Sequence, residues 1–156
     1  MDSFSGNRKG IIILKAIIYA LAGIFVVIAS VMTIPAFRKY MNLSFIIISG
    51  TAFFLLGVAL MFLTLKQKVG GKLKFSLILT GASSAGFFVS EILHNVIYGL
   101  FIHWFGADFW VRIGVDDEPF FFIMAIFLCP IGFLVGIIGS IVLFIKNKKK
   151  YLKVVP

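Results

Sequence analysis

Residues 75–102 read FSLILTGASSAGFFVSEILHNVIYGLFI, an apolar run with one acidic side chain, Glu91, in its second half. Successive residues of a helix turn by about 100°. Measured from Glu91, several polar side chains fall within about 60° on a helical projection: Thr80, Ser84, His94, Asn95 and Tyr98, with Ser76 at the edge. The stretch is therefore predicted to be a helix with a polar stripe along one side.

The stripe is the candidate functional site of this sequence. An ionisable group inside a membrane costs about 2.5–3.5 kcal/mol on insertion scales, so it faces a partner or a water-filled cavity. The predicted binding residues are Glu91, His94, Asn95 and Tyr98. No motif in the sequence names a substrate, a reaction or a cofactor.

The composition is that of a multi-pass membrane protein. Of the 156 residues, 61% are hydrophobic and 13% are charged, whereas soluble domains average about 45–50% apolar and about 25% charged residues. Four stretches exceed the roughly 20 residues that cross a bilayer core; they are residues 11–34, 43–65, 75–102 and 120–145. We expect residues 1–156 to form one all-α integral membrane domain, a bundle of four transmembrane helices.

Basic residues are distributed unevenly between the two sides of this four-span arrangement. One side holds Arg8, Lys9, Lys15, Lys66, Lys68, Lys72, Lys74, Lys146, Lys148, Lys149, Lys150 and Lys153. The other side holds Arg38, Lys39 and Arg112. The positive-inside rule therefore predicts that both termini are cytoplasmic. The net charge of +9 accompanies no nucleic-acid recognition motif, so the expected surroundings are the lipid bilayer and other membrane subunits.

Small residues follow one face of the fourth span. Gly132, Gly136 and Gly139 lie on one side of its helical projection. Small residues let helix backbones approach closely where lipid provides no hydrophobic drive. We expect these glycines to mark helix packing, either within the bundle or in a homo-oligomer. Pro130 is expected to kink the same span.

Residues 103–119, between the third and fourth spans, form a short aromatic and acidic external segment, HWFGADFWVRIGVDDEP. Its two tryptophans suit a membrane boundary, where an indole ring meets lipid and its N–H meets water. The carboxylates of Asp116, Asp117 and Glu118 precede Pro119. Proline favours the first position of a helix and carboxylates favour its N-terminus, so this group is predicted to cap the fourth helix. The alternative is an acidic mouth that concentrates cations above the stripe.

Three functions fit the polar stripe. In the preferred one, the polar side chains satisfy one another and neighbouring helices in a non-enzymatic accessory subunit or structural component of a membrane assembly. In the second, Glu91 and His94 form a proton- or cation-binding pair of an oligomeric transporter or channel, reached past Tyr98.

The third hypothesis is a metal-dependent membrane enzyme. Glu91 and His94 are three residues apart, which places both side chains on one helical face, as in di-iron bundles. Further ligands would come from the external segment: His103, Asp108, Asp116 and Asp117. His103 lies about 180° from His94 on a continuous helix, so it joins such a site only if the helix ends first.

The charge distribution makes a topology prediction. In a variant with no other cysteine, a cysteine at position 112 should react with an impermeant thiol reagent added outside intact cells. Cysteines at positions 70 and 150 should react only after permeabilisation. Labelling of position 70 from outside would contradict the four-span arrangement.

Overall fold

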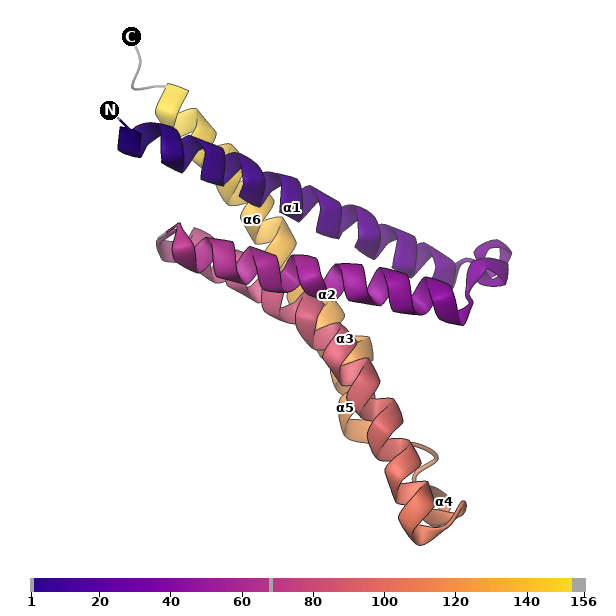
Figure 1. The fold of residues 1–156 in the computed structure, drawn as a ribbon. Helices are drawn as coiled ribbons and strands as arrows, with labels where there is room; N and C mark the ends of the chain where they lie inside the picture. The colour runs from indigo at the N-terminus through magenta and orange to yellow at the C-terminus, as the bar shows by residue number, and fades with distance from the viewer. Residues whose placement is uncertain (1, 68, 153–156) are drawn as a thin grey trace.

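The structure of the chain, a computed structural model, describes residues 2–67 and 69–152, with side chains for residues 9–67 and 69–146 (Figure 1). Over this range the chain is helical and contains no strand. The α-helices are α1 (Asp2–Thr33), α2 (Leu43–Lys66), α3 (Gly71–Phe105), α4 (Phe109–Arg112), α5 (Pro119–Ile123) and α6 (Cys129–Leu152). A 3-10 helix, η1, covers Pro35–Tyr40, and a π-helical turn, η2, covers Met124–Leu128.

Four helical stretches are long and apolar enough to cross a membrane. They are Lys9–Thr33, Leu43–Lys66, Gly71–Phe105 and Pro119–Lys146. This confirms the predicted helical class and the four candidate spans. Helix α3 begins earlier and ends later than the predicted 75–102. At about 1.5 Å per residue, its 35 residues extend about 52 Å. Because a bilayer core is about 30 Å thick, α3 must tilt strongly in a membrane or project beyond the core.

Each break between the spanning helices has a local cause. Helix α1 ends where Ile34 is extended and Pro35, which has no backbone donor, begins η1. Helix α2 begins at a cap, because the side chain of Asn42 accepts a hydrogen bond from the backbone N–H of Phe45 at 2.8 Å. Beyond α3, Gly106 turns the chain with φ at +97°, a backbone conformation that side chains disfavour.

The fourth span contains a widened turn directly before its proline. In η2 the backbone N–H of Cys129 donates to the carbonyl of Met124, five residues earlier. Pro130 then follows in α6, where it cannot donate to the carbonyl four residues earlier. The irregularity expected at Pro130 thus takes the form of a π-turn that joins α5 to α6 in one helical run.

Three glycines let α6 approach the backbone of α3. A Cβ added at Gly136 would lie 2.7 Å from the Thr80 nitrogen and 3.0 Å from the Ser76 carbonyl oxygen. A Cβ at Gly139 would lie 2.7 Å from the Ser76 hydroxyl oxygen. Gly132 faces the next serine hydroxyl along α3 in the same way. A larger side chain at Gly136 would meet the backbone of α3, whereas at Gly132 and Gly139 it would meet serine side chains.

Helix α2 meets the opposite side of α3 by the same means. A Cβ added at Gly57 would lie 2.7 Å from the Gly81 carbonyl oxygen, and one at Gly81 would lie 2.7 Å from the Gly57 carbonyl oxygen. Further along the pair, Gly50 provides the space for the ring of Phe88. Helix α3 is therefore the central helix, held between α2 and α6 by close backbone contacts.

All four spanning helices contribute to one hydrophobic core. Its buried side chains are Leu14, Ile18 and Leu21 of α1, Phe53 and Leu60 of α2, Leu77 of α3, and Phe133, Ile137 and Phe144 of α6. The start of α1, the end of α6 and the link between α2 and α3 lie at one end of the molecule (Figure 1). From that end α2 and α3 run side by side to about the middle of the molecule, where two limbs diverge, α1 with α2 and α3 with the fourth span (Figure 1).

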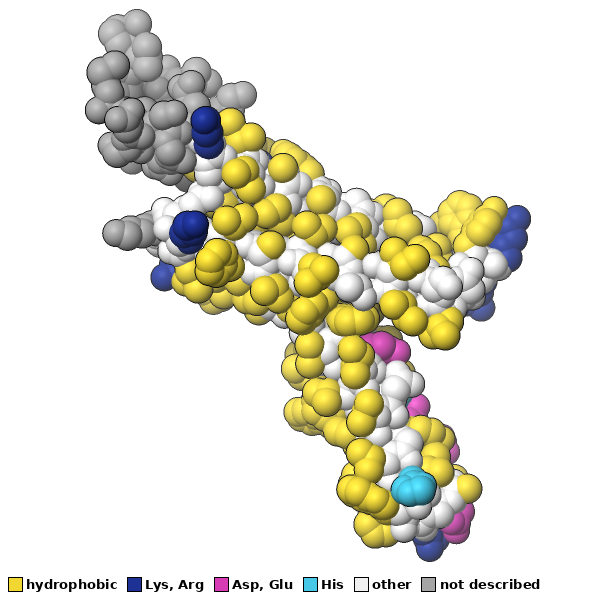
Figure 2. Space-filling view, viewed as in Figure 1, with side chains coloured by type: hydrophobic (Ala, Val, Ile, Leu, Met, Phe, Trp, Pro, Cys, Tyr) yellow, Lys and Arg dark blue, Asp and Glu magenta, His cyan; other side chains and the backbone are white. Residues whose placement is uncertain are grey.

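Lysine and arginine side chains gather at the ends of these limbs, acidic side chains lie along one side of the α3 limb, and hydrophobic side chains cover most of the remaining surface in this view (Figure 2). Exposed lysines at the common end are Lys9, Lys66, Lys72, Lys74 and Lys146. Half-buried Lys15 places its Nζ atom 5.3 Å from the centre of the Phe144 ring. The side chains of Arg8, Lys68, Lys148, Lys149, Lys150 and Lys153 lie outside the described residues. The cytoplasmic location of the common end stays a prediction.

The glycine contacts predict a position-dependent effect of leucine substitution. Gly136→Leu should destabilise the fold by about 1–3 kcal/mol or more, because the added side chain meets the backbone of α3. Gly23→Leu is the matched control, since a Cβ at Gly23 meets nothing within 4 Å. Thermal unfolding in detergent should show a lower Tm for Gly136→Leu alone. Equal Tm values for the two variants would contradict this packing.

Candidate functional site

The polar stripe on α3 divides into a covered half and an open half. In the covered half, Thr80 and Ser84 have no exposed surface. The Thr80 hydroxyl donates to the carbonyl of Ser76 at 2.8 Å, and the Ser84 hydroxyl donates to the carbonyl of Gly81 at 3.1 Å. These short side chains are satisfied by their own helix and lie where α2 and α6 approach. This half of the stripe is a packing surface.

In the open half, Glu91 and Asn95 bond to each other. The Asn95 side-chain amide donates to the Glu91 backbone carbonyl at 2.8 Å and to Glu91 Oε1 at 3.3 Å. Glu91 is half-buried and Asn95 is exposed. One turn further, Gly99 is exposed, and a Cβ added there would meet nothing within 4 Å. Residues four apart share one side of a helix, so Glu91, Asn95 and Gly99 form an open face of α3.

His94, which the transport and enzyme hypotheses pair with Glu91, contacts the acidic external segment. Its Nδ1 atom lies 3.2 Å from the Glu118 carbonyl oxygen and 3.5 Å from Glu118 Oε2. Its Nε2 atom lies 3.5 Å from Asp117 Oδ2. Both ring nitrogens thus face oxygen atoms of the external segment. The side chain fastens the start of α5 to α3.

Glu118 confirms the predicted capping role of the acidic group. Its side chain is almost fully buried, and its two carboxylate oxygens accept hydrogen bonds from the backbone N–H groups of Phe120 and Phe121, each at 2.9 Å. Asp117 accepts from the backbone N–H of Glu118 at 2.7 Å. Asp116 is exposed. The carboxylate of Glu118 therefore stabilises the positive end of the fourth span and also lies beside His94.

Tyr98 belongs to an aromatic cluster at the tip of the α3 limb. Its ring stacks on that of Trp110 with centroids 5.9 Å apart and planes 5° apart, and the Trp110 indole N–H donates to the Tyr98 carbonyl at 3.3 Å. Phe101 and Phe109 pack around the same indole. These contacts fold α4 back against the end of α3. Tyr98 thus packs at the tip, separate from the Glu91–Asn95 pair.

Of the residues of the metal hypothesis, His94 and Asp117 contact each other, whereas Glu91 bonds to Asn95. Helix α3 continues to Phe105, so the helix does not end before His103, which is exposed. Asp108 pairs with Arg112 at 3.3 Å. Over residues 2–67 and 69–152, no group of three or more His, Cys, Asp or Glu side chains is placed to hold a metal ion.

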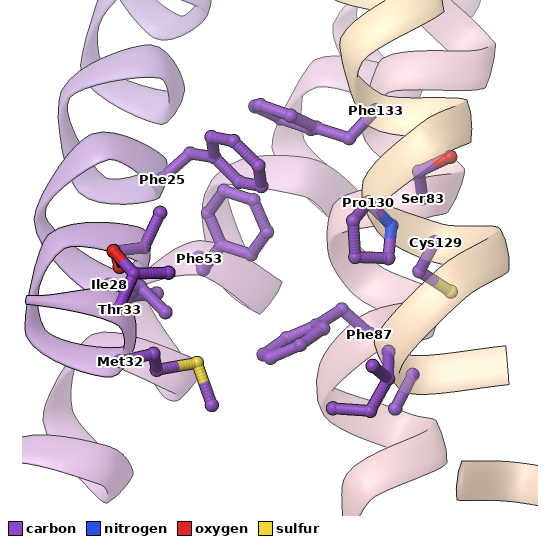
Figure 3. Close-up of a pocket in the computed structure, with 13 residues that line it drawn as sticks. Phe25, Ile28, Met32, Thr33, Phe53, Ser83, Phe87, Cys129, Pro130 and Phe133 are labelled. Atoms are coloured by element: carbon purple, nitrogen blue, oxygen red, sulfur yellow. Dashed lines mark hydrogen bonds between the residues drawn. The ribbon is translucent and has the colours of Figure 1, made fainter. Parts of the chain in front are cut away.

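A second feature of this region is an apolar cavity, which no polar residue pattern in the sequence indicates. Where the limbs diverge, a cavity of about 190 Å³ lies between α1 and the paired α3 and α6 (Figure 3). Its lining is almost entirely apolar and comes from all four spans. Side chains such as Phe25 and Phe87 look like ordinary core residues in the sequence. The sequence predicted a kink at Pro130, one of the lining residues, but no cavity.

The two roles of Glu118 predict the effect of removing its carboxylate. Glu118→Ala should destabilise the fold by about 0.5–2 kcal/mol, the usual effect of losing a helix cap. Glu118→Gln should lie between Glu118→Ala and the parent chain, because the amide keeps one acceptor oxygen. Thermal unfolding in detergent measures these differences, with Asp116→Ala as the exposed control. A Tm for Glu118→Ala equal to that of the control would contradict the cap.

Comparison with known proteins adds no functional assignment to this geometry. No protein-family model, curated protein or solved structure gives a significant match to the chain. The function is therefore inferred from the two features described above, the open face of α3 and the apolar cavity.

Proposed function

We propose that this small membrane protein is a non-enzymatic subunit of a membrane assembly, and that the open face of α3 binds a helix of another subunit. The single observation that carries the proposal is the arrangement of Glu91, Asn95 and Gly99. Two polar side chains and an exposed glycine follow one side of an apolar helix, and the only hydrogen bonds described for the polar pair are with each other.

The carboxyl group of Glu91 gives the open face an energetic reason to be covered. A carboxyl group at membrane depth is costly when it faces hydrocarbon, and such groups almost always face a bundle interior or a water-filled cavity. The bond from Asn95 satisfies part of its hydrogen-bonding capacity. A neighbouring helix that offers a donor from Ser, Thr, Asn, Gln or a basic side chain would satisfy the rest.

Gly99 gives a partner helix the room to approach. The glycines of α2 and α6 that meet α3 each have a neighbouring atom close to the position of an added Cβ, whereas Gly99 has open space there. An exposed glycine on a spanning helix allows a partner backbone to approach, as Gly136 does within this chain. The open face thus combines glycine with polar side chains, as the internal packing surfaces of α3 do, but no helix of the described chain covers it.

The geometry supports the transport hypothesis less well. His94 is held by Asp117 and Glu118, and Tyr98 stacks on Trp110. Neither side chain extends the hydrogen-bonded pair of Glu91 and Asn95 into a chain of proton-transfer groups. The enzyme hypothesis requires the ligands named above to converge. His94 and Asp117 lie in contact, whereas Glu91 bonds to Asn95 and Asp108 pairs with Arg112.

Photo-cross-linking in native membranes tests the proposal. A benzophenone amino acid at position 99 should give a protein adduct of defined mass. The matched control is position 23, the exposed glycine of α1 that also faces open space, which should give lipid adducts only. An adduct of twice the chain mass would identify a second copy as the partner, and any other mass would identify a different subunit.

Two outcomes would contradict the proposed function. One is the absence of a protein adduct at position 99, or equal protein adducts at positions 99 and 23. The other is proton or cation flux through the purified chain in liposomes that is lost in Glu91→Gln. That result would establish the transport hypothesis, because glutamine keeps the shape of the side chain and removes its titratable charge.

A further inference from the structure

The apolar cavity between the two limbs has the size and lining of a hydrocarbon-binding site. Its volume of about 190 Å³ exceeds the roughly 150 Å³ of an engineered apolar cavity that stays dry and binds benzene. The α1 side of the lining runs from Phe25 to Thr33, about 12 Å along the helix axis at 1.5 Å per residue. The cavity is thus long enough to accept a segment of an extended chain.

The lining offers almost no polar group to a ligand. Four phenylalanines approach the cavity from different helices, and Figure 3 shows Phe25 and Phe53 on one side and Phe87 and Phe133 toward the other. The hydroxyl of Thr33, at the outer rim, already donates to the carbonyl of Ala29 at 2.7 Å. A ligand that fits this lining is therefore apolar in the part that the cavity holds.

The irregular part of the fourth span forms one wall. Ala125 and Ile126 lie in the π-turn, and Cys129 and Pro130 follow directly; all four line the cavity. Across the cavity, Ala29 of α1 is small. A π-turn commonly occurs at functional sites, and here it lies where α6 and α1 no longer fill the space between them. The cavity is only partly enclosed, so hydrocarbon from the bilayer can enter it.

A basic segment follows the rim of the cavity directly. Thr33 is the last residue of α1, and η1 then carries Arg38 and Lys39, both exposed. Within the described part of the chain, neither forms an ion pair. Basic side chains at a membrane surface attract anionic headgroups by about 1 kcal/mol per charge. An anionic headgroup at η1 and a hydrocarbon chain in the cavity fit one amphipathic molecule.

We propose that the cavity binds one acyl chain of an anionic phospholipid, with the phosphate of that lipid at Arg38 and Lys39. The acyl chain fills the space among Phe25, Phe87 and Pro130, which the helices of the chain leave open. The gain in binding free energy comes from packing in the cavity and from headgroup charge, because transfer of the acyl chain from bilayer to protein supplies no hydrophobic drive. This site is separate from the open face of α3 and does not depend on the proposed function.

A phospholipid with a photoreactive diazirine in its acyl chain tests the site. The purified chain in nanodiscs containing this lipid should be labelled mainly in residues 25–33 and 125–133, as mapped by mass spectrometry of peptides. Ala29→Phe fills the cavity from α1 and should lose this labelling. Ala20→Phe, an exposed position on the same helix, is the control and should keep it. Circular dichroism and thermal unfolding establish that both variants are folded.

The headgroup half of the proposal has its own measurement. Native mass spectrometry should retain one anionic phospholipid per chain in preference to a zwitterionic one with the same acyl chains. Arg38→Gln and Lys39→Gln should each lower that preference by about fivefold, the equivalent of about 1 kcal/mol per charge. Neither residue lines the cavity. The headgroup measurement therefore tests the site even if Ala29→Phe fails to fold.

Three results would overturn the proposal. The first is labelling spread evenly over lipid-facing positions of the four spans. The second is labelling of Ala29→Phe equal to that of Ala20→Phe. The third is retention of anionic and zwitterionic lipids to the same extent by the parent chain.

Discussion

The close contact of α3 with α2 on one side and α6 on the other is the constraint on which the rest of the structure depends. In a membrane, lipid tails are as apolar as leucine, so helices associate through tight packing and hydrogen bonds. Gly57 and Gly81 place two backbones in contact, and Gly136 does the same toward Thr80. Because two faces of the first half of α3 are used in this way, only short polar side chains fit there, and Thr80 and Ser84 donate to carbonyls of their own helix.

The second half of α3 has a different surrounding because the two limbs separate. Beyond Gly50 and Phe88, α1 and α2 diverge from α3, which continues beside the fourth span and α4 (Figure 1). The same divergence leaves the polar pair of Glu91 and Asn95 uncovered and leaves the cavity unfilled. The molecules proposed to occupy these two spaces are a partner helix on the open face of α3 and an acyl chain between the limbs.

Much of the fold could be predicted from the sequence, and less of the site. Hydrophobic length predicted four helices, and Pro35 and the Glu118–Pro119 pair predicted a break and a cap, because each rule needs only neighbouring residues.

The polar stripe was predicted as one surface because Ser84 and Asn95 are both polar and lie on the same side of a helical projection. Only packing distinguishes a buried hydroxyl from an exposed amide. His94 bonds to Glu118, 24 residues away, a contact set by the path of the external segment and not by helical periodicity. The cavity residues are apolar, like the core, so their composition could not reveal that they border empty space.

Disulfide formation in the membrane tests the central position of α3 most directly. With native Cys129 retained, Gly86→Cys would place one cysteine pair across α3 and α6. In a chain whose Cys129 has been replaced, cysteines at positions 50 and 88 would place a second pair across α2 and α3. A Cβ added at Gly86 lies 3.2 Å from Cys129 Sγ, and one added at Gly50 meets the side chain of Phe88, so neither new cysteine meets the facing backbone. The predicted result is that both pairs form intrachain disulfides, whereas a single cysteine at position 99 forms disulfides only with another chain. Failure of both pairs to bridge in a folded chain, or an intrachain bridge from position 99 to a cysteine in α1 or α2, would contradict the account.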